Sequence, residues 1–144
     1  MRKYLLPAVV CAAVFASPVA FAAQTSDTFQ TRITIQTSCA VTAADVDFGN
    51  VGVINGSETA SGAVVVNCSA GTVWNASFAA LSSVTTLAST MTNANLEDVD
   101  YNATLTQSGG TGPANFSINA TLPTQVTPTA GVTYTDNRVL YINY

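Results

Sequence analysis

The sequence predicts an all-β protein built as a sandwich of antiparallel sheets. Three observations lead to this fold class. Apolar and polar residues alternate with a period of two over many short segments, and no window shows an apolar face at helical spacing. Beyond the N-terminal leader, Thr, Ser and Asn fill more than a third of the chain, with no Lys and only two Glu. Short sequences rich in Gly, Pro and Asn separate the alternating segments, as turns do.

The first residues have the composition of a secretory signal peptide. A positive start, Met1-Arg2-Lys3, precedes an apolar run from Tyr4 to Phe15, and a small-residue stretch then contains Ala20-Phe21-Ala22. The apolar run is shorter than the ~20 residues that a membrane span needs. We therefore expect residues 1–22 to be removed by cleavage after Ala22, with cleavage after Ala23 as the alternative.

The first strand is expected directly after this leader, at about residues 28–37. Its alternation places four side chains on one face, Phe29, Thr31, Ile33 and Ile35. Further strands are expected at about residues 39–42, 45–51, 60–68, 72–79, 99–106, 114–122 and 132–144.

The last expected strand places Leu140, Ile142 and Tyr144 on one face. A sandwich bounded by strands has edges that must be either covered or used, because an exposed edge is a template for pairing with another chain. Such edges can support assembly by strand addition.

Two cysteines follow the leader, Cys39 and Cys68. An even pair in an exported chain indicates a disulfide, because secreted proteins mature in an oxidising compartment. The alternative is a pair of buried free thiols. We expect the disulfide, in a structural role.

Charged groups are scarce, and this excludes several classes of function. The chain has four Lys and Arg, eight Asp and Glu, and no His, and without the leader only Arg32 and Arg138 are basic. Nucleic-acid binding needs clustered basic residues, and nucleophilic catalysis needs a base beside the nucleophile. The acidic residues do not have the spacing of a calcium loop. We therefore expect no enzyme activity, no catalytic residues, no metal, no cofactor and no nucleic-acid partner.

Several motifs in order resemble the spore coat protein U domain family, whose members include Csu-type subunits of archaic chaperone–usher pili. They are Cys39-Ala40-Val41, Asp45-Val46-Asp47-Phe48-Gly49, and Gly62 to Cys68. A C-terminal block agrees, comprising Ala120-Thr121-Leu122-Pro123 with Gln125, Gly131, Tyr134 and Asp136, and the alternating end Val139 to Tyr144. The chain departs from the family pattern before Met91, where the usual basic residue is missing.

The resemblance implies an incomplete immunoglobulin-like β-sandwich that lacks its last strand. It divides the chain into a signal peptide (1–22), an N-terminal donor-strand segment (23–38) and a pilin-like domain (39–144). The resemblance assigns Phe29, Thr31, Ile33 and Ile35 to the donor strand, and Leu140, Ile142 and Tyr144 to the strand that pairs with a chaperone. An ordinary edge strand of the same domain is the alternative for residues 28–37.

The implied partners are a periplasmic chaperone, an outer-membrane usher and other pilus subunits. The implied function is a structural subunit of a surface pilus, exported through the periplasm to the cell surface, that supports adhesion and biofilm formation. Two other functions are kept as alternatives: a secreted coat or matrix protein, and a tip adhesin that binds a surface ligand.

Overall fold

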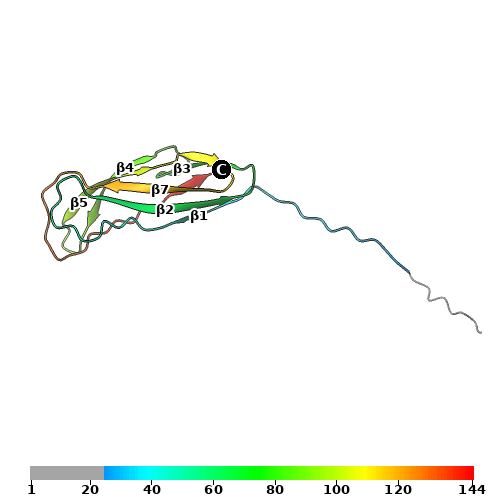
Figure 1. Cartoon of the computed structure of the whole chain (residues 1–144), viewed down its shortest axis with the longest axis horizontal. Helices are drawn as coiled ribbons and strands as arrows, with labels where there is room; N and C mark the ends of the chain where they lie inside the picture. The colour runs from blue at the N-terminus through cyan, green and yellow to red at the C-terminus, as the bar shows by residue number, and fades with distance from the viewer. Residues whose placement is uncertain (1–24) are drawn as a thin grey trace, which may run out of the picture. The chain divides into compact units, whose positions relative to one another are not determined.

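The computed structural model describes residues 25–144, and their regular structure is entirely β. The strands lie in the unit formed by residues 34–144 (Figure 1). They are β1 (Cys39–Ala43), β2 (Thr59–Cys68), β3 (Val73–Ser77), β4 (Thr86–Thr92), β5 (Asp98–Leu105), β6 (Gly109–Thr111), β7 (Ala114–Thr121) and β8 (Tyr141–Asn143). The expected signal peptide, residues 1–22, lies outside the described residues.

Two antiparallel sheets pack into an immunoglobulin-like sandwich, so the predicted all-β fold class is confirmed. The larger sheet has the strand order β1-β2-β7-β5-β4, and the smaller has the order β6-β3-β8. β2 is the longest strand and pairs with both β1 and β7. The smaller sheet has short strands, so it covers less length than the sheet that it faces.

Alternation along the strands determines which side chains form the core. In β2, Val64, Val66 and Cys68 are buried, while the residues between them are exposed. Trp74 of β3 lies opposite them and is 1% exposed. Its ring stacks on Phe116 with 5.9 Å between centroids, and its Nε1 donates a 2.8 Å hydrogen bond to the Gly112 carbonyl. The ring stacking joins the two sheets, and the hydrogen bond to Gly112 satisfies the indole N–H where water is excluded.

The core is divided into two clusters. The cluster around Trp74 combines residues of β2, β3, β5 and β7. The second consists of Ile54, Val99 and Leu122, with partly buried aromatic residues packed around it. Immunoglobulin-like sandwiches ordinarily bury one continuous core between their sheets, and the division marks the position of the groove described below.

Several strand boundaries differ from the sequence-based expectations. Residues 28–37 and 45–51 form no strand, and the strand expected over residues 132–144 is reduced to β8. Conversely, β4 and β6 lie in stretches where no strand was expected. A strand needs a hydrogen-bonded neighbour, and alternation alone does not supply one. β4 forms because seven of its residues pair with β5, whereas residues 132–140 have a single bridge, between Thr135 and Thr92.

Candidate functional site

An open groove of about 600 Å³ runs along the sandwich between two segments of the chain. One wall is formed by residues 43–48, at and after the end of β1, and the other by residues 133–140, which precede β8. The floor consists of inward-facing residues of the larger sheet together with one residue that follows β3. The floor residues are Phe78, Leu87, Met91, Tyr101, Ala103, Ile118 and Ala120.

The floor lies between the two core clusters. Phe78 and Ile118 border the cluster around Trp74, whereas Met91 and Tyr101 border the cluster around Val99. All four are only partly buried, although three of them lie on the inward face of their strands and Phe78 directly follows β3. Apolar side chains in this position lose the hydrophobic stabilisation of full burial, so a further strand placed over them would make the two clusters continuous.

Both walls continue from edge strands. In the part of the chain that the structure describes, β1 pairs only with β2, and β8 pairs only with β3. Each therefore leaves one row of backbone N–H and C=O groups without a strand neighbour. The expected chaperone-pairing residues lie at this place: Ile142 belongs to β8, Leu140 lines the groove just before it, and Tyr144 is 64% exposed.

A polar network attaches the second wall of the groove to β4 and β5. Asp136 Oδ2 accepts hydrogen bonds from Ser89 Oγ (2.8 Å), Tyr101 Oη (2.9 Å) and Arg138 Nε (2.8 Å). Burial alone would raise the pKa of Asp136, but the bonds from Arg138, Ser89 and Tyr101 outweigh it and lower the pKa below its ordinary value. Asp136 is therefore a carboxylate at neutral pH and ties residues 135–138 to β4 and β5.

A second carboxylate fixes the start of the same wall. Glu97 accepts hydrogen bonds from Asn93 (2.6 Å), Thr129 (2.5 Å) and Tyr134 (3.0 Å). These bonds, with that from Thr129 the largest, lower the pKa of Glu97. The loop that precedes β8 is thus attached through Asp136 and through Glu97. Its backbone pairs with a strand only at Thr92 within the described residues, so the groove stays open.

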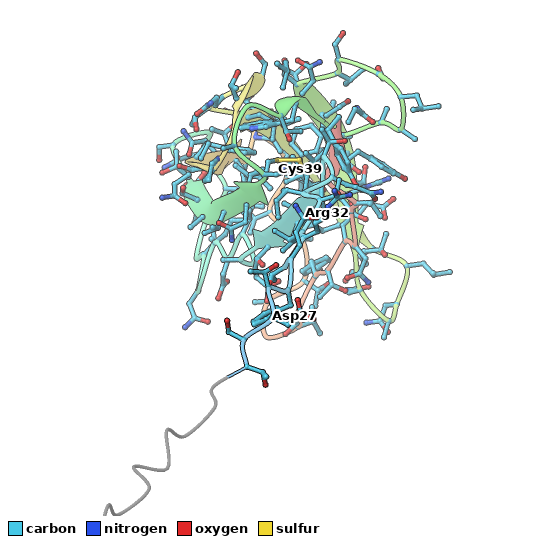
Figure 2. The ribbon with its side chains drawn as sticks, turned by 90° about the vertical axis from the view of Figure 1, so that its right-hand side faces the viewer. Asp27, Arg32 and Cys39 are labelled. Atoms are coloured by element: carbon cyan, nitrogen blue, oxygen red, sulfur yellow. A yellow bond between two sulfur atoms is a disulfide. The ribbon has the colours of Figure 1, made fainter. Side chains whose placement is uncertain are left out.

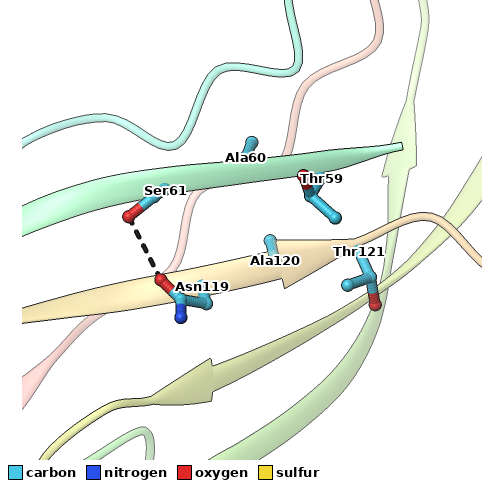
Figure 3. A pocket seen from close by; sticks show the side chains of 6 residues that line it. All are labelled: Thr59, Ala60, Ser61, Asn119, Ala120 and Thr121. Atoms are coloured by element: carbon cyan, nitrogen blue, oxygen red, sulfur yellow. Dashed lines mark hydrogen bonds between the residues drawn. The ribbon is translucent and has the colours of Figure 1, made fainter. Parts of the chain in front are cut away.

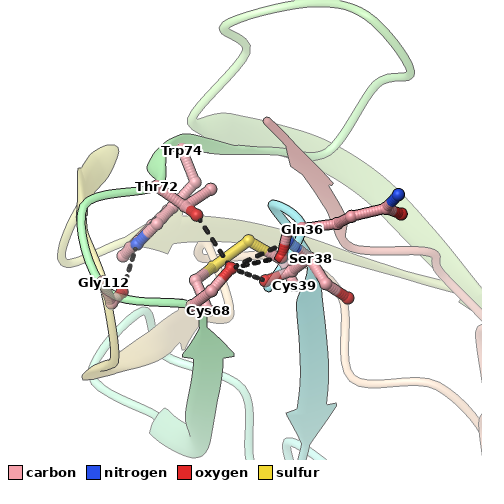
Figure 4. The surroundings of a disulfide bond; sticks show 8 residues. Gln36, Ser38, Cys39, Cys68, Thr72, Trp74 and Gly112 are labelled. Carbon is pink, nitrogen blue, oxygen red and sulfur yellow. Dashed lines mark hydrogen bonds between the residues drawn. A yellow bond between two sulfur atoms is a disulfide. The ribbon is translucent and has the colours of Figure 1, made fainter. Parts of the chain in front are cut away.

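A disulfide holds the first strand at the other wall. Cys39 and Cys68 face each other in the β1–β2 pairing, and a bond joins their sulfur atoms (Figure 4). Next to it, the Ser69 N–H donates to the Ser38 carbonyl at 2.9 Å, and Ser69 Oγ accepts from the Ser38 N–H at 2.9 Å. The backbone immediately before β1 is therefore fixed to the end of β2.

The N-terminal segment carries three exposed apolar side chains among polar residues. Phe29 is 91% exposed, Ile33 83% and Ile35 71%, and none belongs to a strand. The hydrogen bonds within residues 25–33 are local, such as that from Arg32 Nε to Gln30 Oε1 at 3.1 Å. Asp27 and Arg32 of this segment are labelled in Figure 2. A row of exposed apolar side chains in alternation has the pattern of a strand without its sheet.

In a comparison with known protein families, the model of the Spore Coat Protein U domain matches residues 25–103. The chain belongs to the Spore Coat Protein U domain family. The family consists of structural domains associated with chaperone–usher pilus subunits, and it is not an enzyme family. No curated protein and no solved structure matches the chain.

The family match includes the exposed N-terminal segment, the four strands β1 to β4 and most of β5. The C-terminal block, to which the sequence analysis extended the resemblance, lies outside the matched residues. Sequence reasoning also missed the contribution of β4 to the site. The Ser89–Asp136 contact joins residues 47 positions apart, and no local pattern indicates such a pairing.

The other surfaces of the described residues are weaker candidates for a functional site. A hollow of about 500 Å³ lies over β2 and β7, lined by small and hydroxyl side chains, with Ser61 Oγ donating to Asn119 Oδ1 at 3.1 Å (Figure 3). Within residues 25–144, no three His, Cys, Asp or Glu residues are grouped so as to hold a metal ion. The described residues also contain no helix long and apolar enough to cross a membrane.

Proposed function

We propose that the protein is a structural subunit of a bacterial surface pilus that assembles by donor-strand exchange. The N-terminal segment of one copy, or of another subunit, inserts into the groove of the next. The observation that carries this proposal is the pair of complementary features in one chain: a groove whose apolar floor has no strand over it, and a row of exposed apolar side chains that belongs to no sheet.

The energetics favour insertion. Burying a Phe or Ile side chain contributes about 1.5–3 kcal/mol, so Phe29, Ile33 and Ile35 together supply roughly 5–9 kcal/mol as an upper bound. The inserted backbone also pairs with the free edges of the groove walls. Thr31, the fourth residue of the row, adds a side chain of smaller apolar area.

Before assembly, the same groove needs temporary cover. A subunit with an open apolar floor and unpaired strand edges is prone to aggregate. We propose that a periplasmic chaperone supplies a strand that pairs along residues 138–144, with Leu140, Ile142 and Tyr144 on the pairing strand, and that an outer-membrane usher mediates the exchange. The signal peptide, residues 1–22, directs export, and the pilus at the cell surface supports adhesion and biofilm formation.

Removal of the donor segment tests this function. A chain without residues 23–35, which keeps the Gln36 carbonyl near Ser69, should still bind the chaperone and fail to form fibres in electron micrographs. Adding the full-length protein should give short polymers capped by the truncated chain. Fibres built from the truncated chain alone would contradict strand donation by this segment. If the truncated chain failed to bind the chaperone, the division of the chain into a donor segment (residues 23–38) and a separate domain (residues 39–144) would be wrong.

A further inference from the structure

The turn before β2 surrounds an Asn–Gly dipeptide with hydrogen-bonding groups. Asn55 and Gly56 both donate their backbone N–H to Glu58 Oε2, at 3.2 and 3.1 Å. The side-chain oxygen Oδ1 of Asn55 accepts from the Ser57 N–H at 3.0 Å and from the Ser57 hydroxyl. Thr124 Oγ1 donates to the Asn55 carbonyl at 2.9 Å. The backbone N–H, the backbone carbonyl and the side-chain oxygen of Asn55 thus all have partners, two of them within the turn and the third at Thr124.

The packing requires glycine after Asn55. Gly56 has φ of +90°, a conformation that side chains rarely adopt, and a Cβ at this position would lie 2.6 Å from Thr124 Oγ1. The absence of a side chain also leaves the Gly56 nitrogen open to attack on the neighbouring amide. The turn is exposed, so water reaches it.

We propose that Asn55 is a site of self-catalysed deamidation, with Glu58 as the general base and Ser57 as the donor that stabilises the developing oxyanion. The hydrogen bond from the Gly56 N–H places Glu58 at the proton that must leave. The two bonds from Ser57 lie on Asn55 Oδ1, the oxygen on which negative charge develops. Glu58 and Ser57 thus meet the two requirements for attack of the Gly56 nitrogen on the Asn55 side-chain amide. Glu58 is the base that takes the leaving proton, and Ser57 is the donor to the developing oxyanion.

The reaction balances with water as its only co-reactant. Glu58 takes the Gly56 amide proton while the Gly56 nitrogen bonds to the Asn55 side-chain carbonyl carbon. The tetrahedral intermediate expels the side-chain nitrogen as ammonia, which leaves with the transferred proton, and a five-membered succinimide remains. Water then opens either carbonyl of the ring and gives aspartate or isoaspartate at position 55. No oxidation or reduction occurs.

The product changes the loop that packs beside the second core cluster. A carboxylate at position 55 stands next to Glu58, and two neighbouring like charges repel each other. In the isoaspartate form the backbone runs through the former side chain, so the carbonyl held by Thr124 becomes a carboxylate outside the backbone. We expect a slowly accumulating, more acidic form of the protein with a loosened turn at residues 51–58.

Intact protein kept at neutral pH and 37 °C, with peptide mapping over time, tests the proposal. Asn55 should deamidate faster in the folded protein than in the same chain held in denaturant, where the turn is absent. Glu58→Gln should slow the folded-state reaction by about tenfold, a modest share of what general acid–base groups contribute. Ser57→Ala, which keeps the Ser57 N–H but removes its hydroxyl, should slow it by a smaller factor.

Thr90→Ala is the matched control, since this exposed hydroxyl on β4 bonds only to Asp100 in the described structure, and it should leave the rate unchanged. Circular dichroism confirms that each variant is folded. Two results would overturn the proposal: slower deamidation in the folded than in the denatured protein, or an unchanged rate in folded Glu58→Gln.

Discussion

The replacement Ile33→Asp separates the stability of the subunit from the strength of the joint between subunits. Ile33 is 83% exposed in the chain by itself. A charge there should change the free energy of unfolding of the monomer by less than about 0.5 kcal/mol, as for other surface substitutions. In a joint formed by donor-strand exchange, the same side chain would be buried in an apolar groove.

The cost in the joint follows from that burial. Losing a buried Ile removes about 1.5–3 kcal/mol, and an unpaired buried carboxylate adds a further penalty. A total of at least about 3 kcal/mol corresponds to a joint weakened more than about a hundredfold. We expect folded Ile33→Asp monomers with an unchanged melting temperature and no fibres.

The matched control is Thr34→Asp, which places the same charge on the opposite face of the extended segment. It should still form fibres, with only a small change in the temperature at which they dissociate. Electron microscopy and thermal dissociation on gels measure both variants. Normal fibres from Ile33→Asp, or equal loss in both variants, would refute the assigned face of the donor strand.

Three further results are expected from the domain. Replacing both Cys39 and Cys68 with Ser should lower the free energy of unfolding by roughly 3–4 kcal/mol, since the disulfide closes a loop with a sequence separation of 29. Asp136→Asn should cost about 1–2 kcal/mol at neutral pH, because it weakens hydrogen bonds made to a charged acceptor. Leu96→Gly should stabilise the domain by about 1 kcal/mol, because Leu96 has φ of 62° and is 86% exposed.

Acid titration checks the second of these results. The folded pKa of Asp136 lies below its ordinary value, so its stabilisation is present above about pH 4 and is lost as pH falls through the lowered value. Asp136→Asn should therefore show a smaller loss of melting temperature between pH 7 and pH 3. An identical acid profile in both proteins would contradict the role of the carboxylate. Chemical denaturation measures the other two, and a destabilised Leu96→Gly would contradict the strain at that turn.

Local patterns determined much of the fold. The period-two burial of Val64 and Val66 follows from side chains that alternate across a strand, so β2 could be predicted from its composition. The same pattern marked Phe29, Ile33 and Ile35 as one face. A disulfide could be predicted because only Cys39 and Cys68 follow the leader.

Only the tertiary structure decided which alternating segments have partners. Residues 132–140 were expected to belong to the last strand, yet they form a groove wall because a single bridge, between Thr135 and Thr92, is their only strand pairing within the described residues. Leu87 and Met91 of β4 reach the groove floor through pairing with β5, which their Thr- and Ser-rich surroundings do not indicate. Side-chain alternation is local and is written in the sequence, whereas a hydrogen-bonded neighbour is supplied by distant residues or by another chain. For this reason one protein can hold both an alternating row of apolar side chains that has no sheet, at Phe29, Ile33 and Ile35, and a groove whose floor has no strand over it.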